Sequence, residues 1–146
     1  MTKTLPCGIG LKLVAGESDV YLDMALEMLE TILRCERENR PCVMIVPVGP
    51  TGQYPILAEL CNRLNVSLKH VHFFNMDEYL ITPDTAIEPD HFMSFHKRME
   101  TEFYSRVRAD LVMPESQRHF PVDFEKLLRL KQRKWATLVA KFERSL

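Results

Sequence analysis

The sequence lacks the features that mark metal-ribbon, membrane-spanning and nucleic-acid-binding proteins. Its four cysteines show no Cys-x-x-Cys spacing, which argues against a zinc ribbon or a dithiol redox motif. No apolar stretch approaches the roughly 20 residues that cross a bilayer. The formal net charge is only −1, and aromatic and basic residues do not interleave as they do on nucleic-acid surfaces. We therefore expect neither a nucleic acid nor a membrane as partner.

The composition is that of a soluble globular domain. The 146 residues are enough to bury a core, and 46% are apolar and 27% charged. Pro6, Gly8 and Gly10 interrupt the apolar residues at the start, so we expect no signal peptide. The cysteines fall mostly in apolar or helical contexts, where free thiols behave as small hydrophobic groups. We therefore expect a cytoplasmic protein with reduced cysteines.

The order of predicted elements is that of an α/β fold. Apolar runs and helical periodicity predict strands at 11–14, 42–48 and 71–75, with helices at 20–37 and 55–64 between them. The connection between the second and third strands is long enough for a parallel crossover. A helix from about 91 to 107 and a short strand at 110–113 follow. The pattern predicts a parallel sheet with flanking helices.

The ends of the helices also have sequence signals. Ser18 or Asp19 can cap the first helix, and Asn65 can close the second.

We divide the chain into an α/β part, residues 1–121, and a basic amphipathic tail helix, residues 122–146. The tail either packs its apolar stripe on the protein or binds a membrane surface or a calmodulin-like partner.

Two strand ends contain the candidate functional residues. Asp77 and Glu78 follow the strand at 71–75, and the loop Gly49-Pro50-Thr51-Gly52 follows the strand at 42–48. Parallel strands bring their carboxyl ends to one edge, where α/β proteins bind ligands. Glycines let a ligand approach the backbone, and the next helix directs unpaired N–H groups to the same place. The loop therefore suits a phosphate or a sugar hydroxyl, although the same residues also make a plain strand-to-helix turn.

Asp77 is the candidate catalytic residue. Its apolar neighbours Phe73, Phe74 and Met76 predict partial desolvation, which would raise its pKa above the ~3.9 of free aspartate. Such a base can remove a proton next to a carbonyl group. In the alternative interpretation, Asp77 or Glu78 caps the next element or pairs with a basic residue.

The histidines do not complete a metal site. His70 and His72 share one face of their strand, but no Cys, Asp or Glu stands at a matching distance. The sequence also contains no Ser-His-Asp elbow, P-loop or dinucleotide fingerprint. We expect no metal and no redox cofactor.

The string Asn75-Met76-Asp77-Glu78-Tyr79, with Pro50-Thr51-Gly52 upstream and Ser94-Phe95 and Phe103-Tyr104 downstream, resembles the glucosamine-6-phosphate deaminase (isomerase) family. The resemblance covers roughly residues 10 to 120. It implies a Rossmann-like α/β fold and the conversion of glucosamine 6-phosphate to fructose 6-phosphate and ammonia. It further implies that Asp77 removes the C2 proton of the opened sugar, and that Gly49, Thr51, Gly52 and Glu78 line the substrate site.

The chain also departs from this family. Gln53 and Tyr54 replace small hydroxyl residues, and the family's Gly-Asp-Gly-His-Ile-Ala-Phe-Asn-Glu-Pro segment and later phosphate-binding residues have no counterpart. We therefore interpret the chain as an N-terminal portion, weakly active or inactive, with an incomplete sheet whose exposed edge or face allows a homo-oligomer. We class the activity as isomerase and hydrolase. The alternatives are a 6-phosphogluconolactonase-like hydrolase and a non-catalytic module that binds a sugar phosphate or a partner subunit.

Overall fold

A computed structural model describes residues 2–4, 6–82 and 85–121, and every structural statement below concerns these residues. The predicted tail helix, residues 122–146, lies outside them, so its helical character and the boundary at residue 121 stay predictions. None of the helices in the described ranges has the length and hydropathy that crossing a bilayer requires.

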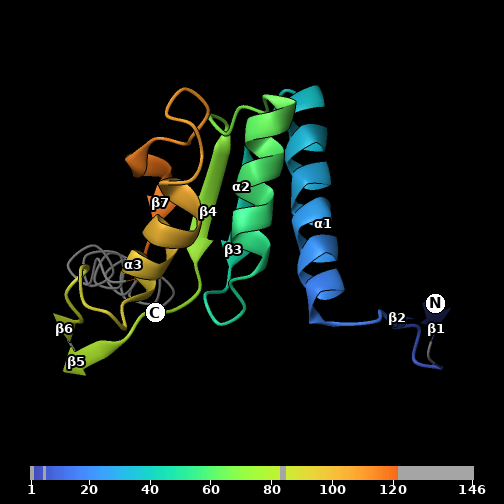
Figure 1. Cartoon of the computed structure of the whole chain (residues 1–146), viewed down its shortest axis with the longest axis horizontal. Coiled ribbons are helices and arrows are strands. Elements are labelled where there is room, and N and C mark those ends of the chain that lie inside the picture. The colour runs from blue at the N-terminus through green and yellow to red at the C-terminus, as the bar shows by residue number, and fades with distance from the viewer. Residues whose placement is uncertain (1, 5, 83–84, 122–146) are drawn as a thin grey trace, which may run out of the picture.

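The central feature is a three-stranded parallel sheet (Figure 1). Its strands lie in the order β3 (Cys42–Val46), β4 (Val71–Asn75) and β7 (Arg118–His119). β3 and β4 pair along their whole length, with Cys42 opposite Val71 and Val46 opposite Asn75. The sheet confirms the predicted α/β class with parallel strands and flanking helices.

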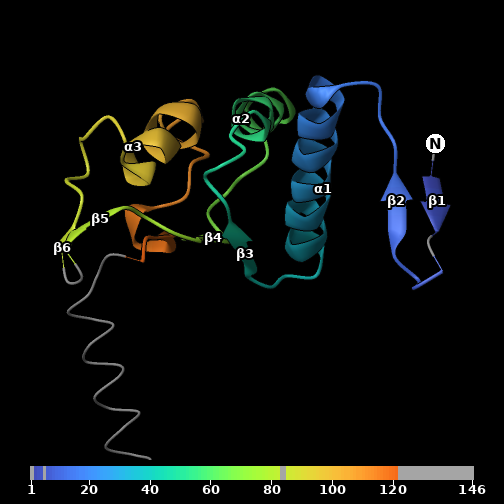
Figure 2. The same ribbon diagram turned by 90° about the horizontal axis from the view of Figure 1, so that it is seen from below.

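Helices cover one face of this sheet. α2 (Gln53–Leu64) connects β3 to β4, and α3 (Phe95–Met99) continues into the π-helical turn η1 (Glu100–Tyr104). Both lie on the same side of the strands in Figure 2, and α1 (Glu17–Arg37) packs beside α2. Aromatic side chains pack against one another in the core. Among them, Phe73 and Phe103 have ring centroids 5.4 Å apart.

The opposite face of the sheet is bare in the described part of the chain. Val43, Ile45 and Phe74 are 61%, 71% and 43% exposed. Parallel sheets normally bury both faces, so these exposed fractions are unusual for large apolar side chains. That the sheet is incomplete stays a prediction.

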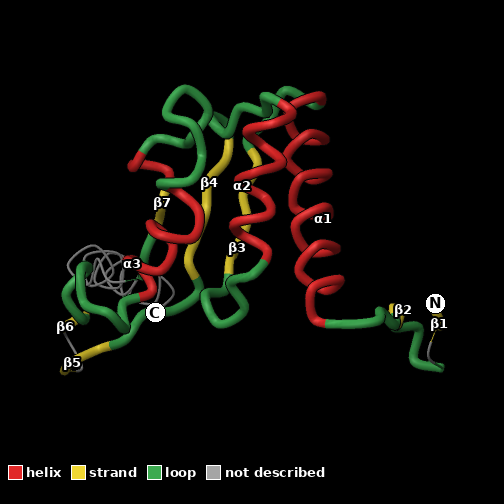
Figure 3. The backbone as a smooth tube through the Cα atoms, viewed as in Figure 1, coloured by secondary structure: helices red, strands yellow, loops and turns green. Residues whose placement is uncertain are grey.

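Smaller elements lie outside the parallel sheet. β1 (Thr2–Thr4) and β2 (Gly10–Lys12) form an antiparallel hairpin that projects beyond α1 (Figure 3). β5 (Leu80–Thr82) and β6 (Thr85–Ala86) form a second hairpin, and a 3₁₀ turn, η2 (Glu115–Gln117), precedes β7.

The central elements agree with the predictions. The strand at 71–75 has the predicted bounds, the strand at 42–48 ends two residues earlier, and the two run parallel. The two long helices begin two or three residues before their predicted starts and end as predicted. Asn65 closes α2 with a φ of 57°, the left-handed conformation that ends many helices.

The peripheral predictions need correction. The predicted strand at 11–14 pairs with the N-terminal residues instead of the parallel sheet. Residues 110–113 form turns, and the third strand is β7. Neither Ser18 nor Asp19 is the cap of α1, because the helix begins one turn earlier than predicted and its cap is Gly16. The predicted helix at 91–107 begins only at Phe95, where the Ser94 hydroxyl accepts a hydrogen bond from the Lys97 N–H at 3.3 Å.

Candidate functional site

The glycine loop and the acidic pair meet at the carboxyl edge of the sheet. The Met76 N–H donates to the Val46 carbonyl at 3.0 Å, one residue beyond the β3–β4 ladder. Asp77 is the second residue after β4, and residues 47–52 follow directly on β3. Both loops leave the lower edge of the sheet in Figure 1. The predicted arrangement of one loop and one acidic segment at a common edge is therefore correct.

Gly52 is required by a close packing contact. A Cβ atom built on Gly52 would lie 2.3 Å from Cδ2 of Tyr21, a side chain of α1, which is far inside contact distance. The Tyr21 hydroxyl donates to the Glu17 carboxylate, which fixes the ring over the loop. Gly49, in contrast, has no atom within 4 Å of such a Cβ, so it leaves open space at the same edge.

The buried side chains of Gln53 and Tyr54 hold the glycine loop by hydrogen bonds to its backbone. Both side chains are fully buried, and the Gln53 amide donates to the Pro50 carbonyl at 2.8 Å. The Tyr54 hydroxyl donates to the Pro47 carbonyl, and burial raises its pKa. The two residues that depart from the family pattern therefore hold the backbone of residues 47–50 in place. Among the described residues, Oε1 of Gln53 has no hydrogen-bond partner.

Asp77 is exposed, and in the described part of the chain it has neither a hydrogen-bond nor an ion-pair partner. The predicted partial desolvation is wrong because the apolar neighbours turn away from it. Phe73 is buried in the core, and Phe74 stacks on His119 on the bare face, with ring centroids 4.1 Å apart. Asp77 is thus available to a ligand but is not activated by burial.

Glu78 caps the helix that follows. Its carboxylate accepts hydrogen bonds from the Ser94 hydroxyl at 3.0 Å and from the N–H groups of Phe95 and His96, both at 2.9 Å. These donors form the first turn of α3, which has no earlier carbonyls to bind. The alternative in which one of the two acids caps the next element therefore applies to Glu78. Its predicted role in substrate binding stays a prediction.

Asn75 is a polar residue of this edge that sequence reasoning did not single out. It is buried at the end of β4, and its amide donates to the His119 carbonyl at 3.0 Å, which ties β4 to β7. Tyr104 lies in the same layer, and burial raises its pKa to about 12. A polar side chain at the last position of an apolar strand is the signal that marks Asn75.

Two of the five histidines, His72 and His119, lie on the bare face of the sheet. Nδ1 of His72 is 3.3 Å from Nε2 of His119, and their rings stack. Gln117 contacts the other ring nitrogen of His72 at 3.2 Å. In the described ranges, no group of three or more His, Cys, Asp or Glu residues is placed to hold a metal ion.

Part of the chain is similar in sequence to known proteins. No family model matches the chain. The chain is 38% identical over 71 residues to the glucosamine-6-phosphate deaminase of Aeromonas salmonicida (strain A449) and 40% identical over 72 residues to that of Pasteurella multocida (strain Pm70). The predicted resemblance to the glucosamine-6-phosphate deaminases is confirmed. These matches cover 47% and 48% of this chain and 25% of each relative.

A solved structure supports the fold. It is described as a monomeric glucosamine-6-phosphate deaminase, a "missing link of the NagB superfamily", and aligns with a TM-score of 0.61 and 21% identity. The alignment covers 86% of this chain and 49% of that one, so the chain spans about half its length. At this identity the likeness establishes the α/β fold alone.

The predicted hydrolase class is wrong. The most similar curated relatives are named glucosamine-6-phosphate deaminase, a name that fits the isomerase and amino-sugar terms and not a hydrolase.

Proposed function

We propose that the carboxyl edge of the β3–β4 sheet is the substrate site of a deaminase-isomerase for amino-sugar phosphates, and that it binds a small phosphorylated sugar. The main support is the hydrogen bond from Met76 to Val46, because it brings the glycine loop and Asp77 to one edge. The names of the curated relatives supply the substrate class.

The chemistry follows from the two loops. The backbone N–H groups of Gly49, Thr51 and Gly52 and the positive end of α2 attract phosphate or sugar oxygens. The Asp77 carboxylate takes the proton from C2 of the opened sugar, and the electrons of the C–H bond form the enediol-type intermediate. The proton is then returned to C1, and water adds at C2 and displaces the amino group as ammonia. In this proposal the protein converts glucosamine 6-phosphate and water to fructose 6-phosphate and ammonia without a redox cofactor, in the cytoplasm.

We further propose that these 146 residues alone have little or no turnover and act mainly as a sugar-phosphate-binding module. Asp77 is exposed, and among the described residues it has no hydrogen-bond or ion-pair partner that would orient it. Glu78 already uses both carboxylate oxygens at the start of α3. Positioning groups act together, so an isolated base contributes little catalysis.

Calorimetry with glucosamine 6-phosphate, fructose 6-phosphate and inorganic phosphate tests the binding site, and ammonia release tests turnover. We expect millimolar or tighter binding of the sugar phosphates, weakened several-fold by Asp77→Asn. Glu30→Gln, which removes an equal charge from an exposed position on α1, is the matched control and should bind like the wild type. Equal binding by Asp77→Asn and wild type would refute the site. If the wild type releases ammonia and Asp77→Asn does not, the proposal that this chain has little or no turnover is refuted, and the proposed site at Asp77 stands.

A further inference from the structure

We propose that Cys35 and Cys42 are a redox modification site, at which they form a reversible disulfide that locks the turn between α1 and β3. The oxidant is a small-molecule disulfide of the glutathione type. Cytosolic disulfides are mostly transient or redox-sensing, and a reversible bridge between two core cysteines belongs to that class. The proposal is independent of the sugar-phosphate site.

The turn after α1 folds the chain back onto the end of the helix. Asn39 has the left-handed backbone conformation, with a φ of 49°, and the Arg40 N–H donates to the Cys35 carbonyl at 3.1 Å. This is the hydrogen bond with which a Schellman motif closes a helix. β3 then begins at Cys42, whose N–H donates to the His70 carbonyl at 2.9 Å. The backbone therefore fixes one cysteine on each side of a tight turn.

The two thiols meet inside the core. Cys35 is 1% exposed and Cys42 is fully buried, and both belong to one cluster of packed core residues. Burial raises the pKa of Cys42 to about 12, and a hydrogen bond between its thiol and the Cys35 side chain adds to this effect. Thiols that hydrogen-bond to each other are on side chains directed toward each other, which is the main geometric requirement of a disulfide.

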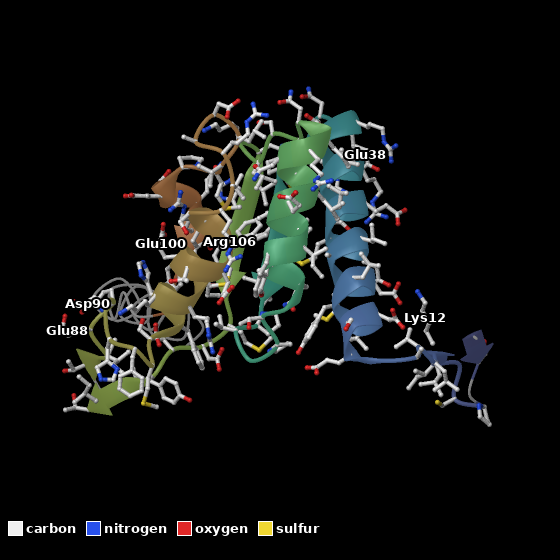
Figure 4. All side chains as sticks on the ribbon, viewed as in Figure 1. Lys12, Glu38, Glu88, Asp90, Glu100 and Arg106 are labelled. Atoms are coloured by element: carbon white, nitrogen blue, oxygen red, sulfur yellow. The ribbon has the colours of Figure 1, made fainter. Side chains whose placement is uncertain are left out.

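Basic side chains lie close to the pair. Arg34 is in the last turn of α1, and Arg40 is in the turn that follows, with its Nε 2.5 Å from the Glu38 carboxylate. Figure 4 shows Glu38 at the end of α1 where this turn begins. Both guanidinium groups lower the pKa of Cys42, against the larger effect of burial. They favour the thiolate, which is the form that attacks a disulfide.

The reaction is a thiol–disulfide exchange in two steps. The thiolate of one cysteine attacks a sulfur of oxidised glutathione, which forms a mixed disulfide and releases one glutathione. The thiolate of the other cysteine then attacks the protein sulfur of the mixed disulfide, which forms the Cys35–Cys42 bond and releases the second glutathione. The protein loses two electrons, and the protons of its two thiols end on the two glutathione molecules. Because both thiols are buried, the exchange takes place during folding or while the end of α1 is open.

Oxidation of the full chain at equilibrium tests the proposal. Cys7→Ser removes the exposed thiol, and this variant is refolded from urea at pH 8 in mixtures of reduced and oxidised glutathione. Alkylation of the remaining thiols and mass spectrometry then map the bridge, which we expect between Cys35 and Cys42. The equilibrium constant for its formation should be about ten- to a hundredfold larger in the folded protein than in the same variant kept in urea, because folding has already brought the two thiols together.

Single substitutions separate this pair from the other buried thiol. Cys61→Ala is the matched control, because Cys61 is as buried as Cys42 and burial alone raises its pKa, so the bridge should form as before. Cys35→Ala should leave Cys42 and Cys61 as free thiols. If Cys35→Ala does not fold, the bridge mapped in the parent variant decides the question.

Circular dichroism shows whether the bridged protein keeps the fold of the reduced protein, as we expect. A bridge between any other two cysteines, an equilibrium constant no larger in the folded protein than in urea, or a bridged form without the native spectrum would each overturn the proposal.

Discussion

Replacing Glu78 tests which of the two adjacent acids is structural. Its carboxylate accepts from one buried hydroxyl and two backbone N–H groups at the start of α3, at 2.9–3.0 Å. Glu78→Ala leaves these three donors without their acceptor. We expect α3 to lose its anchor to the β4 loop and the whole fold to lose stability.

The magnitude follows from the three hydrogen bonds. A hydrogen bond to a charged group contributes about 1.5–3 kcal/mol, and loss of a helix cap costs about 1 kcal/mol. Because Glu78 is half-buried, water replaces part of each bond, and about 1 kcal/mol per contact is the reasonable value. Glu78→Ala should therefore lower the free energy of unfolding by roughly 3 kcal/mol. Glu78→Gln keeps one acceptor oxygen and should cost about half as much.

Urea unfolding followed by circular dichroism measures these differences. Asp77→Asn is the matched control: it alters the neighbouring acid, which is exposed and without a described partner, and should change stability by less than about 0.5 kcal/mol. A Glu78→Ala variant as stable as Asp77→Asn would show that the cap contributes nothing and return Glu78 to the candidate ligand residues.

Three further predictions concern the glycine loop and the cysteines. Gly52→Ala should lower the free energy of urea unfolding by about 1–3 kcal/mol because its Cβ meets the Tyr21 ring. A second substitution, Tyr21→Ser, should restore most of this stability. Additive losses of stability from the two changes would contradict the contact. With a thiol reagent at pH 8, Cys7 should react at once and the buried cysteines only on unfolding, and fast reaction of more than one thiol would be inconsistent with the packing. Burial raises the pKa of the Cys42 and Cys61 thiols to about 12, so the folded state keeps protons that the unfolded chain loses above about pH 9. Stability should accordingly fall between pH 9 and 12 by up to about 1.4 kcal/mol per pH unit for each thiol, and replacing Cys61 with Ala should reduce that slope.

The elements that sequence predicted well are those whose own residues bury the core. The strand at 71–75 and the helices at 20–37 and 55–64 have strong apolar patterns, and the structure places them close to the predicted bounds. Asn65 at the end of α2 follows from local backbone preference alone. These features depend on near neighbours in sequence, which a pattern can capture.

The elements that sequence missed depend on distant partners. Residues 110–113 are as apolar as a short strand, but β4 instead pairs with Arg118 and His119, whose polar side chains give no strand signal. Gly52 looked like a turn or ligand-binding glycine, and only the position of Tyr21, 31 residues earlier in the chain, shows why a side chain cannot fit there. Pairing and close approach are properties of the folded chain, so a linear pattern cannot supply them.

Asp77 and Glu78 show the same limit within the candidate site. Consecutive residues of an extended chain direct their side chains to opposite sides, so one acid turns toward α3 and the other toward solvent. Either residue could have taken either position by sequence pattern, because both are carboxylates at a strand end. The structure separates them: Glu78 is committed to three donors of the next helix, and Asp77 has none among the described residues. In the proposed function, proton transfer at this edge is therefore assigned to Asp77, whose carboxylate oxygens accept no hydrogen bond from the described residues and are available to a bound sugar phosphate.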